Sequence, residues 1–289
     1  MLCEPQIPYL QIPELPLVPS GAIADGVPEM PITIKPFGAL VAVGVYVGAA
    51  LVLRQGRRLG FEPQAVMSLL LHVLVAGFIG GHVFALLWYF PGRVLEEPWS
   101  LVAIWEGQSS FGGFTGAVLG GLWWRSRWRT QLLPYADLVC SALPVGWAFG
   151  RAGCSLAHDH PGIRSQAFIA VRFPGGGRLD LGLLEFSFTV VLAAVFLWLR
   201  RRPRPWGFYA GLICIAYAPF RFGLDFLRAR TLPAFLGAPD VRYGSLTPAQ
   251  WACFVVLPLG VGLFWWALRR AGDSGATRPP PLPEPERLD

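Results

Sequence analysis

The stretch Gly150-Arg151-Ala152-Gly153-Cys154-Ser155-Leu156-Ala157-His158-Asp159-His160-Pro161-Gly162 decides how the rest of the chain is interpreted. It follows the apolar run from Tyr135 to Phe149. An apolar segment therefore delivers an arginine, an acid and two histidines to one membrane surface. Ionisable side chains beside lipid are costly and are functional-site candidates by default. The alternative interpretation is an interfacial arginine whose side chain reaches out to water.

Composition places the whole chain in the membrane class. Of its 289 residues, 54% are hydrophobic and only 15% are charged, which is too apolar for an ordinary soluble domain. Apolar runs recur along the full length, so we expect one polytopic membrane domain. The net charge of +6 comes from arginines that cluster beside the apolar runs. This pattern indicates membrane topology and excludes a nucleic-acid partner.

Seven apolar runs predict an all-α fold with seven transmembrane helices. In chain order they are about residues 36–53, 65–90, 111–124, 135–149, 181–199, 206–222 and 248–268. The third run is shorter than the roughly 20 residues that cross a bilayer, so its flanking polar residues or a locally thin bilayer must supply the difference. Its glycines at 112, 116 and 120 recur every fourth residue, which predicts a face for close helix contact.

Dense arginine clusters follow the first, third, fifth and seventh predicted helices. Because short basic loops face the cytoplasm, we expect the N-terminus outside and the C-terminus inside. Residues 1–35 then form an irregular outer arm, and residues 36–270 form the seven-helix transmembrane domain. The expected outer loops of that domain are residues 91–110, 150–180 and 223–247. Residues 271–289 are expected to be a disordered cytoplasmic tail, because they are polar and rich in proline.

The cysteines and the isolated histidines give no sign of a metal site. The five cysteines are Cys3, Cys140, Cys154, Cys214 and Cys253. No CxxC or Cys/His metal spacing is present, so we expect no metal, no cofactor and no disulfide framework. His82, within the second apolar run, is expected to be a packed or interfacial side chain; a ligand role is the less favoured interpretation.

Further polar residues are expected on the same outer side as the 150–162 stretch. Glu185 lies just inside the fifth predicted helix, where an acid normally faces a partner or a cavity. If helical, Arg221, Asp225 and Arg228 share one face at i, i+4 and i+7. The alternative is a local ion pair at a surface. At the start of the last helix, Thr247 is the expected N-cap, followed by a proline at the first helical position.

In their order and spacing these segments resemble the prolipoprotein diacylglyceryl transferase family, from about residue 32 to residue 269. The segments that carry the resemblance are Pro-Phe-Gly at 36–38, Ser-Phe-Gly-Gly at 110–113, Gly-Arg-Ala-Gly at 150–153, and the blocks 178–185, 221–225 and 245–250. The resemblance implies an enzyme of the bacterial inner membrane with its active site toward the outer side. Such an enzyme moves the diacylglyceryl group of phosphatidylglycerol onto the lipobox cysteine of a preprolipoprotein. A thioether forms and glycerol phosphate leaves.

The residue types suit that chemistry. The leaving group is an anionic phosphate ester, so the guanidinium groups of Arg151 and Arg221 are candidates to bind it and to stabilise its developing charge. The acceptor thiol has an unperturbed pKa of about 8.5 and needs a base or a positive field. Asp159, His158 and His160 therefore join the two arginines as catalytic candidates. The substrate-binding candidates are Arg151, Gly112, Gly113, Cys154, Glu185, Asp225 and Arg228.

The chain departs from the family pattern at four positions. Phe111 stands where the pattern has a histidine, Cys154 where asparagine is usual, and Asp159 and Asp225 where glutamates are usual. Three routes for the thiol proton stay open: His158 or His160 as the base, both histidines as solvated residues, or activation by the arginine field alone. The rival functions are a non-catalytic paralogue that binds anionic phospholipid or lipoprotein segments, and a lipid transferase with another acceptor. In every case the lipid bilayer is a partner.

Overall fold

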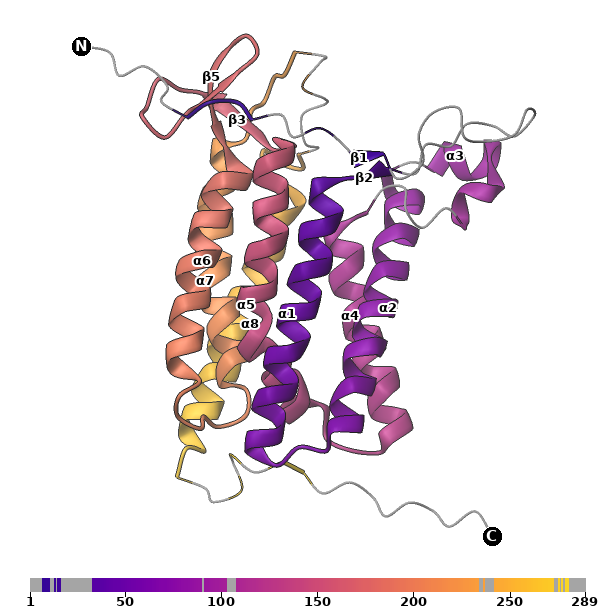
Figure 1. The fold of residues 1–289 in the computed structure, drawn as a ribbon, viewed down its shortest axis with the longest axis vertical. Coiled ribbons are helices and arrows are strands. Elements are labelled where there is room, and N and C mark those ends of the chain that lie inside the picture. The colour runs from indigo at the N-terminus through magenta and orange to yellow at the C-terminus, as the bar shows by residue number, and fades with distance from the viewer. Residues whose placement is uncertain are drawn as a thin grey trace. The chain divides into compact units, whose positions relative to one another are not determined.

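The computed structural model describes residues 7–10, 13, 15–16, 33–89, 91–102, 108–233, 236, 242–272, 275, 277 and 279–280. Most of these residues are helical (Figure 1). The long helices are α1 (Pro36–Leu59), α2 (Pro63–Tyr89), α4 (Ser110–Trp128), α5 (Leu132–Ala157), α6 (Leu181–Leu199), α7 (Phe208–Leu224) and α8 (Pro248–Arg269). The short helices are α3 (Pro91–Glu96), η1 (Pro98–Leu101) and η2 (Asp225–Leu227). The strands are β1 (Leu15–Pro16), β2 (Thr33–Ile34), β3 (Pro161–Arg164), β4 (Val171–Phe173) and β5 (Gly176–Asp180).

Six helices among the described residues are long and apolar enough to cross a membrane. They are α1, α2, α5, α6, α7 continued through η2, and α8. This is a polytopic, mostly helical membrane protein, as the composition predicted. The third predicted span forms as the helix α4 but is not among these six. Its glycines, together with Arg125 and Arg127, reduce its hydropathy.

Helix α5 differs most from its predicted bounds. It begins at Leu132 and ends at Ala157, rather than covering 135–149. Residues 150–157 are therefore helical and do not belong to an outer loop. Glycine weakens an isolated helix, but here tertiary packing compensates. A Cβ on Gly153 would lie 2.8 Å from a ring carbon of Phe37, so α1 packs directly on the helix at this point.

The helices divide into two compact units, which are described separately. Unit 1 contains Met1–Gly48, Ser141–Arg202 and Tyr209–Trp266. Unit 2 contains Ala49–Cys140, Pro203–Phe208 and Ala267–Asp289. Helices α1, α5, α7 and α8 contribute residues to both units.

In unit 2, α2 and α4 lie side by side, and the glycines of α4 allow the two backbones to approach closely (Figure 1). A Cβ on Gly116 would lie 2.1 Å from the carbonyl oxygen of Ala76, and one on Gly120 would lie 2.5 Å from that of His72. A Cβ on Gly112 would clash with α2 in the same way. The predicted contact face at every fourth residue is therefore confirmed.

The buried side chains of unit 2 include a cluster of aromatic rings. Trp124 and Tyr135 are buried with their ring centroids 4.7 Å apart, and Phe61 packs edge-on against Tyr135. His82 is fully buried, and its Nε2 donates to the carbonyl oxygen of Ser100 at 3.0 Å. The prediction of a packed His82 is confirmed.

Unit 1 contains a small sheet that the sequence did not predict. Strands β3, β5 and β4 are antiparallel and lie in that order, and Ile7 forms an isolated bridge with Val171. Strand β5 runs directly into α6, so the sheet lies at the start of that helix (Figure 1). Leu181 and Leu224 belong to the buried cluster beneath it. The predicted 150–180 loop is thus a helix end followed by a three-stranded sheet, which the prediction of an all-α membrane protein did not include, although the fold is mostly helical as predicted.

The remaining predicted loops and termini are only partly described. Within the predicted outer arm, Leu15–Pro16 pairs with Thr33–Ile34 as an antiparallel ladder. The rest of that arm, apart from residues 7–10, 13 and 35, lies outside the described residues. The same is true of 103–107 in the first loop, of 234–235 and 237–241 in the third, and of most of the predicted 271–289 tail.

Candidate functional site

The carboxylate of Glu185 lies at the centre of the candidate site, one turn into α6. Its side chain is completely buried. Arg151 Nη2, from α5, lies 3.0 Å from Glu185 Oε1, and Arg221 Nη1, from α7, lies 3.3 Å from Oε2. The Tyr217 hydroxyl donates to Oε1 at 2.5 Å. One buried carboxylate therefore connects three helices through ion pairs and charge-assisted hydrogen bonds.

Asp225 is the second buried carboxylate of the network, at the end of α7. Arg221 Nη2 lies 3.2 Å from its Oδ1, and Arg228 Nε donates to the same oxygen at 2.7 Å. The Thr247 hydroxyl donates to Oδ2. The expected ion pairs of Asp225 are present, but they are not merely local, because Arg221 also contacts α6.

The start of α8 is fixed by a reciprocal cap. The backbone N–H of Gln250 donates to Thr247 Oγ1 at 3.2 Å, and the side-chain oxygen of Gln250 accepts from the N–H of Thr247 at 3.0 Å. Pro248 occupies the first helical position. The predicted N-cap is confirmed, and the same threonine holds Asp225.

The network carries more positive than negative charge. Three arginines share two buried carboxylates, and the side chains of Arg151 and Arg221 are only 14% exposed. Arg151 also lies over the ring of Trp147, at 5.9 Å from its centroid. Among the described residues, the buried Nε of Arg151 has no hydrogen-bond partner. The network therefore has the charge and the donor capacity to bind an anion.

A second cluster begins one helical turn after Arg151. Arg151 Nη1 donates to Cys154 Sγ at 3.7 Å. One ligand atom from each of Cys154, Asp159 and His160 lies within 4.8 Å of the others. The thiol is buried, whereas the side chains of Asp159 and His160 are 45% and 28% exposed. Burial lowers the pKa of His160 below its ordinary value, although Asp159 opposes that shift.

His158 belongs to a different set of contacts. Its Nδ1 lies 2.5 Å from Asp180 Oδ2, and its ring stacks on Tyr9 with centroids 4.2 Å apart. Asp180 also caps α6 by accepting from the N–H of Leu183 at 3.1 Å. Burial raises the pKa of Asp180 despite the hydrogen bond to His158. His158 has a left-handed backbone, with φ of 51°, and joins the end of α5 to the start of α6.

The structure brings most of the predicted site residues together in unit 1. They are Arg151, Cys154, Asp159, His160, Glu185, Arg221, Asp225 and Arg228. The described contacts of His158 do not include this group. Gly112 and Gly113 lie in unit 2, at the start of α4. Phe111 lies on the same turn, but its side chain falls outside the description.

Sequence reasoning missed three members of these networks. Tyr217 lies four residues before Arg221, so their shared helix face was a signal that it would reach Glu185. Asp180 was recognisable as a helix cap, but not as the partner of His158. Tyr9 gave no signal, because its contact with His158 joins segments that are far apart in the sequence.

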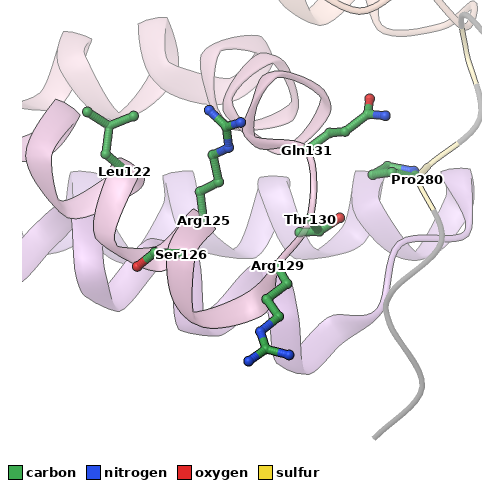
Figure 2. Close-up of a pocket in the computed structure, with 7 residues that line it drawn as sticks. All are labelled: Leu122, Arg125, Ser126, Arg129, Thr130, Gln131 and Pro280. Atoms are coloured by element: carbon green, nitrogen blue, oxygen red, sulfur yellow. The ribbon is translucent and has the colours of Figure 1, made fainter.

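An open cavity of about 710 Å³ in unit 2 is lined by Leu122, Arg125, Ser126, Arg129, Thr130, Gln131 and Pro280 (Figure 2). Figure 2 shows the side chains of Arg125 and Arg129 extending in opposite directions from the end of α4. Their guanidinium groups do not converge, and none of the described residues that line the cavity is acidic. The converging arginines of unit 1 are therefore the better anion site.

The comparisons with known proteins all match one family. Residues 27–266 match the sequence model of the family described as prolipoprotein diacylglyceryl transferase. The chain is 30% identical to the phosphatidylglycerol–prolipoprotein diacylglyceryl transferase of Chromohalobacter salexigens over 255 residues, which is 84% of this chain and 92% of that relative. The relative of the same name from Pseudomonas paraeruginosa is 30% identical over 264 residues, covering 88% of this chain and 96% of its own length. The relative of the same name from Pseudomonas putida strain F1 is 29% identical over 276 residues, which is 91% of this chain and 97% of that relative.

Proposed function

Because the chain belongs to the prolipoprotein diacylglyceryl transferase family, we propose that it transfers the diacylglyceryl group of phosphatidylglycerol to the lipobox cysteine of preprolipoproteins. The cysteine sulfur forms a thioether with the glyceryl carbon, and glycerol phosphate leaves. The observation that carries the proposal is the convergence of Arg151 and Arg221 on the buried carboxylate of Glu185. It gives an anionic lipid phosphate two pre-oriented guanidinium groups at one place.

In this proposal the arginine network performs the leaving-group half of the reaction. As the glyceryl carbon–oxygen bond breaks, its electron pair passes to the phosphate oxygen, and negative charge develops there. Arg151 and Arg221 stabilise that charge with donors already in position, and such preorganised stabilisation is usually the largest single contribution to catalysis. Glu185 and Asp225 orient the guanidinium groups, and Arg228 supplies a further contact to the headgroup. Gly112 and Gly113 are proposed substrate contacts on the family resemblance alone.

The substrate thiol loses its proton at the cluster of Cys154, Asp159 and His160. Of the two candidate histidines, His160 is the better placed to take the proton. It lies beside Cys154, and Cys154 accepts a hydrogen bond from Arg151, which is proposed to hold the lipid phosphate. His158 acts as a positioning residue, because its pair with Asp180 holds the chain immediately before Asp159. In this arrangement the substrate thiol would lie on one side of Arg151, and the lipid phosphate on the other.

We further propose seven membrane-crossing helices, with α4 as the seventh, in the bacterial inner membrane. Arginine clusters in the last turns of α1 and α4, directly after α6 and at the end of α8 support an outer N-terminus and a cytoplasmic C-terminus. Under this topology the 1–35 arm and the 91–110, 150–180 and 223–247 segments face outward, as does the active site. The 271–289 tail faces the cytoplasm.

The direct test is to incubate the purified protein with phosphatidylglycerol and a lipobox peptide and to measure the peptide mass. We expect a diacylglyceryl increment on the peptide, and none on a peptide whose cysteine is replaced by serine. An unmodified peptide would refute the proposed activity. If Phe111→His then created transfer, the chain would be a lipid-binding paralogue that has lost its chemistry.

A further inference from the structure

We propose that Cys154, Asp159 and His160 form a zinc-binding site whose open fourth position takes the substrate thiol. The inference rests on the proposed transfer to a thiol and says how that thiol is activated. It concerns three residues whose sequence spacing gave no sign of a metal site. Their convergence is a property of the fold.

The distances suit a zinc ion after small side-chain movements. Asp159 Oδ1 and His160 Nε2 are 3.7 Å apart, and ligand atoms of all three residues lie within 4.8 Å of one another. Zinc binds sulfur at about 2.3 Å and nitrogen or oxygen at about 2.0–2.2 Å, so tetrahedral ligand atoms are separated by roughly 3.3–3.8 Å. The Asp159–His160 distance is already in that range. The side chains of Asp159 and His160 are 45% and 28% exposed, so in this proposal a rotation of each side chain brings its ligand atom the remaining distance toward the buried thiol.

The donor set also matches the chemistry of a catalytic zinc site. Three protein ligands with one open position are characteristic of zinc enzymes, whereas structural sites have four protein ligands. A thiolate, a carboxylate and a neutral imidazole together neutralise a divalent ion. The soft sulfur donor favours zinc over the hard cations magnesium and calcium.

The surroundings hold the three ligands in place. Cys154 lies near the end of α5, and a Cβ on Gly182 would come within 3.0 Å of its carbonyl carbon, so α6 packs closely on that backbone. The His158–Asp180 pair fixes the chain immediately before Asp159. Arg151 Nη1 donates to Cys154 Sγ at 3.7 Å, so this contact must lengthen when a metal binds the sulfur. The ion pair of Arg151 with Glu185 at 3.0 Å, a carboxylate that it shares with Arg221, reduces the repulsion of a cation only in part.

The step that this site performs balances without another reagent. The substrate cysteine binds to the metal as a thiolate and releases its proton to water, because a coordinating thiol is deprotonated outright. The bound sulfur attacks the glyceryl carbon of phosphatidylglycerol. The carbon–oxygen bond breaks, and its electron pair goes to the phosphate oxygen held by Arg151 and Arg221. No histidine is then required at position 111, where this chain has phenylalanine.

Metal binding is tested on the full-length protein, purified without a polyhistidine tag, stripped with a chelator and held in detergent micelles. Cadmium is the probe, because a bound cysteine thiolate gives an ultraviolet charge-transfer band. We expect one equivalent of cadmium to produce the band in the wild type, and zinc to displace it. The band should disappear in Cys154→Ser and persist in Cys140→Ser, a matched change on the same helix.

The affinity for zinc is then measured by competition with a chromophoric chelator. His160→Ala and Asp159→Ala should each weaken binding by more than the roughly 10- to 100-fold that loss of an outer-shell partner costs. The control His72→Ala, on α2, should bind as the wild type does. Absence of the band, or equal loss of it in Cys140→Ser, would overturn the site. Unchanged zinc affinity in His160→Ala and Asp159→Ala would overturn the ligand assignment.

Transfer assays separate this inference from the proposed function. Chelator-treated protein should lose transfer of the diacylglyceryl group to a lipobox peptide, and added zinc should restore it. Full transfer by the metal-free protein would overturn the inference while leaving the proposed function intact, with His160 acting directly as the base. Zinc binding without any transfer would refute the proposed function and, with it, the catalytic role of the metal.

Discussion

Replacing Glu185 with glutamine should strongly destabilise the helical unit that holds the site. The carboxylate is completely buried, forms ion pairs with Arg151 and Arg221 from different helices, and accepts hydrogen bonds from Arg221 and Tyr217. An amide of the same shape keeps one acceptor oxygen but removes the negative charge. Its NH₂ group would also face an arginine, so a donor would meet a donor.

The magnitude follows from these contacts. A hydrogen bond to a charged group contributes about 1.5–3 kcal/mol, and removing one partner of a buried ion pair costs about 3–5 kcal/mol. The contacts share a single carboxylate, so their losses do not add. We therefore expect a loss of about 3–5 kcal/mol for Glu185→Gln. At about 2–4 °C per kcal/mol for a chain of this size class, the melting temperature should fall by roughly 6–20 °C.

The assay is thermal unfolding of the purified protein in detergent, followed by tryptophan fluorescence and by size-exclusion recovery after heating. Glu62→Gln is the matched control, because Glu62 is an exposed glutamate between α1 and α2. Its melting temperature should stay within about 2 °C of the wild type, since exposed charges contribute little. If Glu185→Gln also melted within that margin, the connection of α5, α6 and α7 through this carboxylate would be refuted.

Three further predictions concern lipid binding, the histidines and the topology. Arg151→Lys or Arg221→Lys should weaken phosphatidylglycerol binding by about tenfold or more in native mass spectrometry, because lysine cannot supply a bidentate fork; unchanged binding in both would refute the phosphate assignment. His160→Ala should lower the transfer rate by roughly a hundredfold or more without weakening lipid binding, whereas His158→Ala should mainly lower thermal stability. Unchanged turnover in a His158→Ala/His160→Ala double variant would eliminate both histidines, as bases and as metal ligands, and would favour activation by the arginine field. In intact cells an impermeant thiol reagent should label a cysteine introduced at Gln166 but not one at Ser126; the reverse pattern would overturn the topology.

Much of the helical framework could be predicted because its signals are local. Apolar runs bounded by arginines located the long helices, and the fourfold glycine spacing of α4 predicted its close contact with α2. The end of α5 could not be located in this way, since glycines at 150 and 153 argue against a helix. That helix persists because Phe37 packs against Gly153, a contact between segments far apart in the sequence.

The site was predictable in its residue types but not in its pairing. Arginines and acids on the outer side indicated anion chemistry, yet their spacing did not show that Arg151 and Arg221 share Glu185. The convergence of Cys154, Asp159 and His160 had no spacing signal. It arises because α5 ends at Ala157 and the left-handed residue His158 redirects the chain, so the next two residues lie beside Cys154.

The most direct test of the central claim measures both products of one reaction. The purified protein is supplied with phosphatidylglycerol and a lipobox peptide, and the peptide thioether and free glycerol phosphate are quantified together. We predict equal amounts of the two products from the wild type, and neither from a folded Arg151→Ala/Arg221→Ala double variant. Undiminished formation of both products by the double variant, or formation of neither by the wild type, would contradict the account.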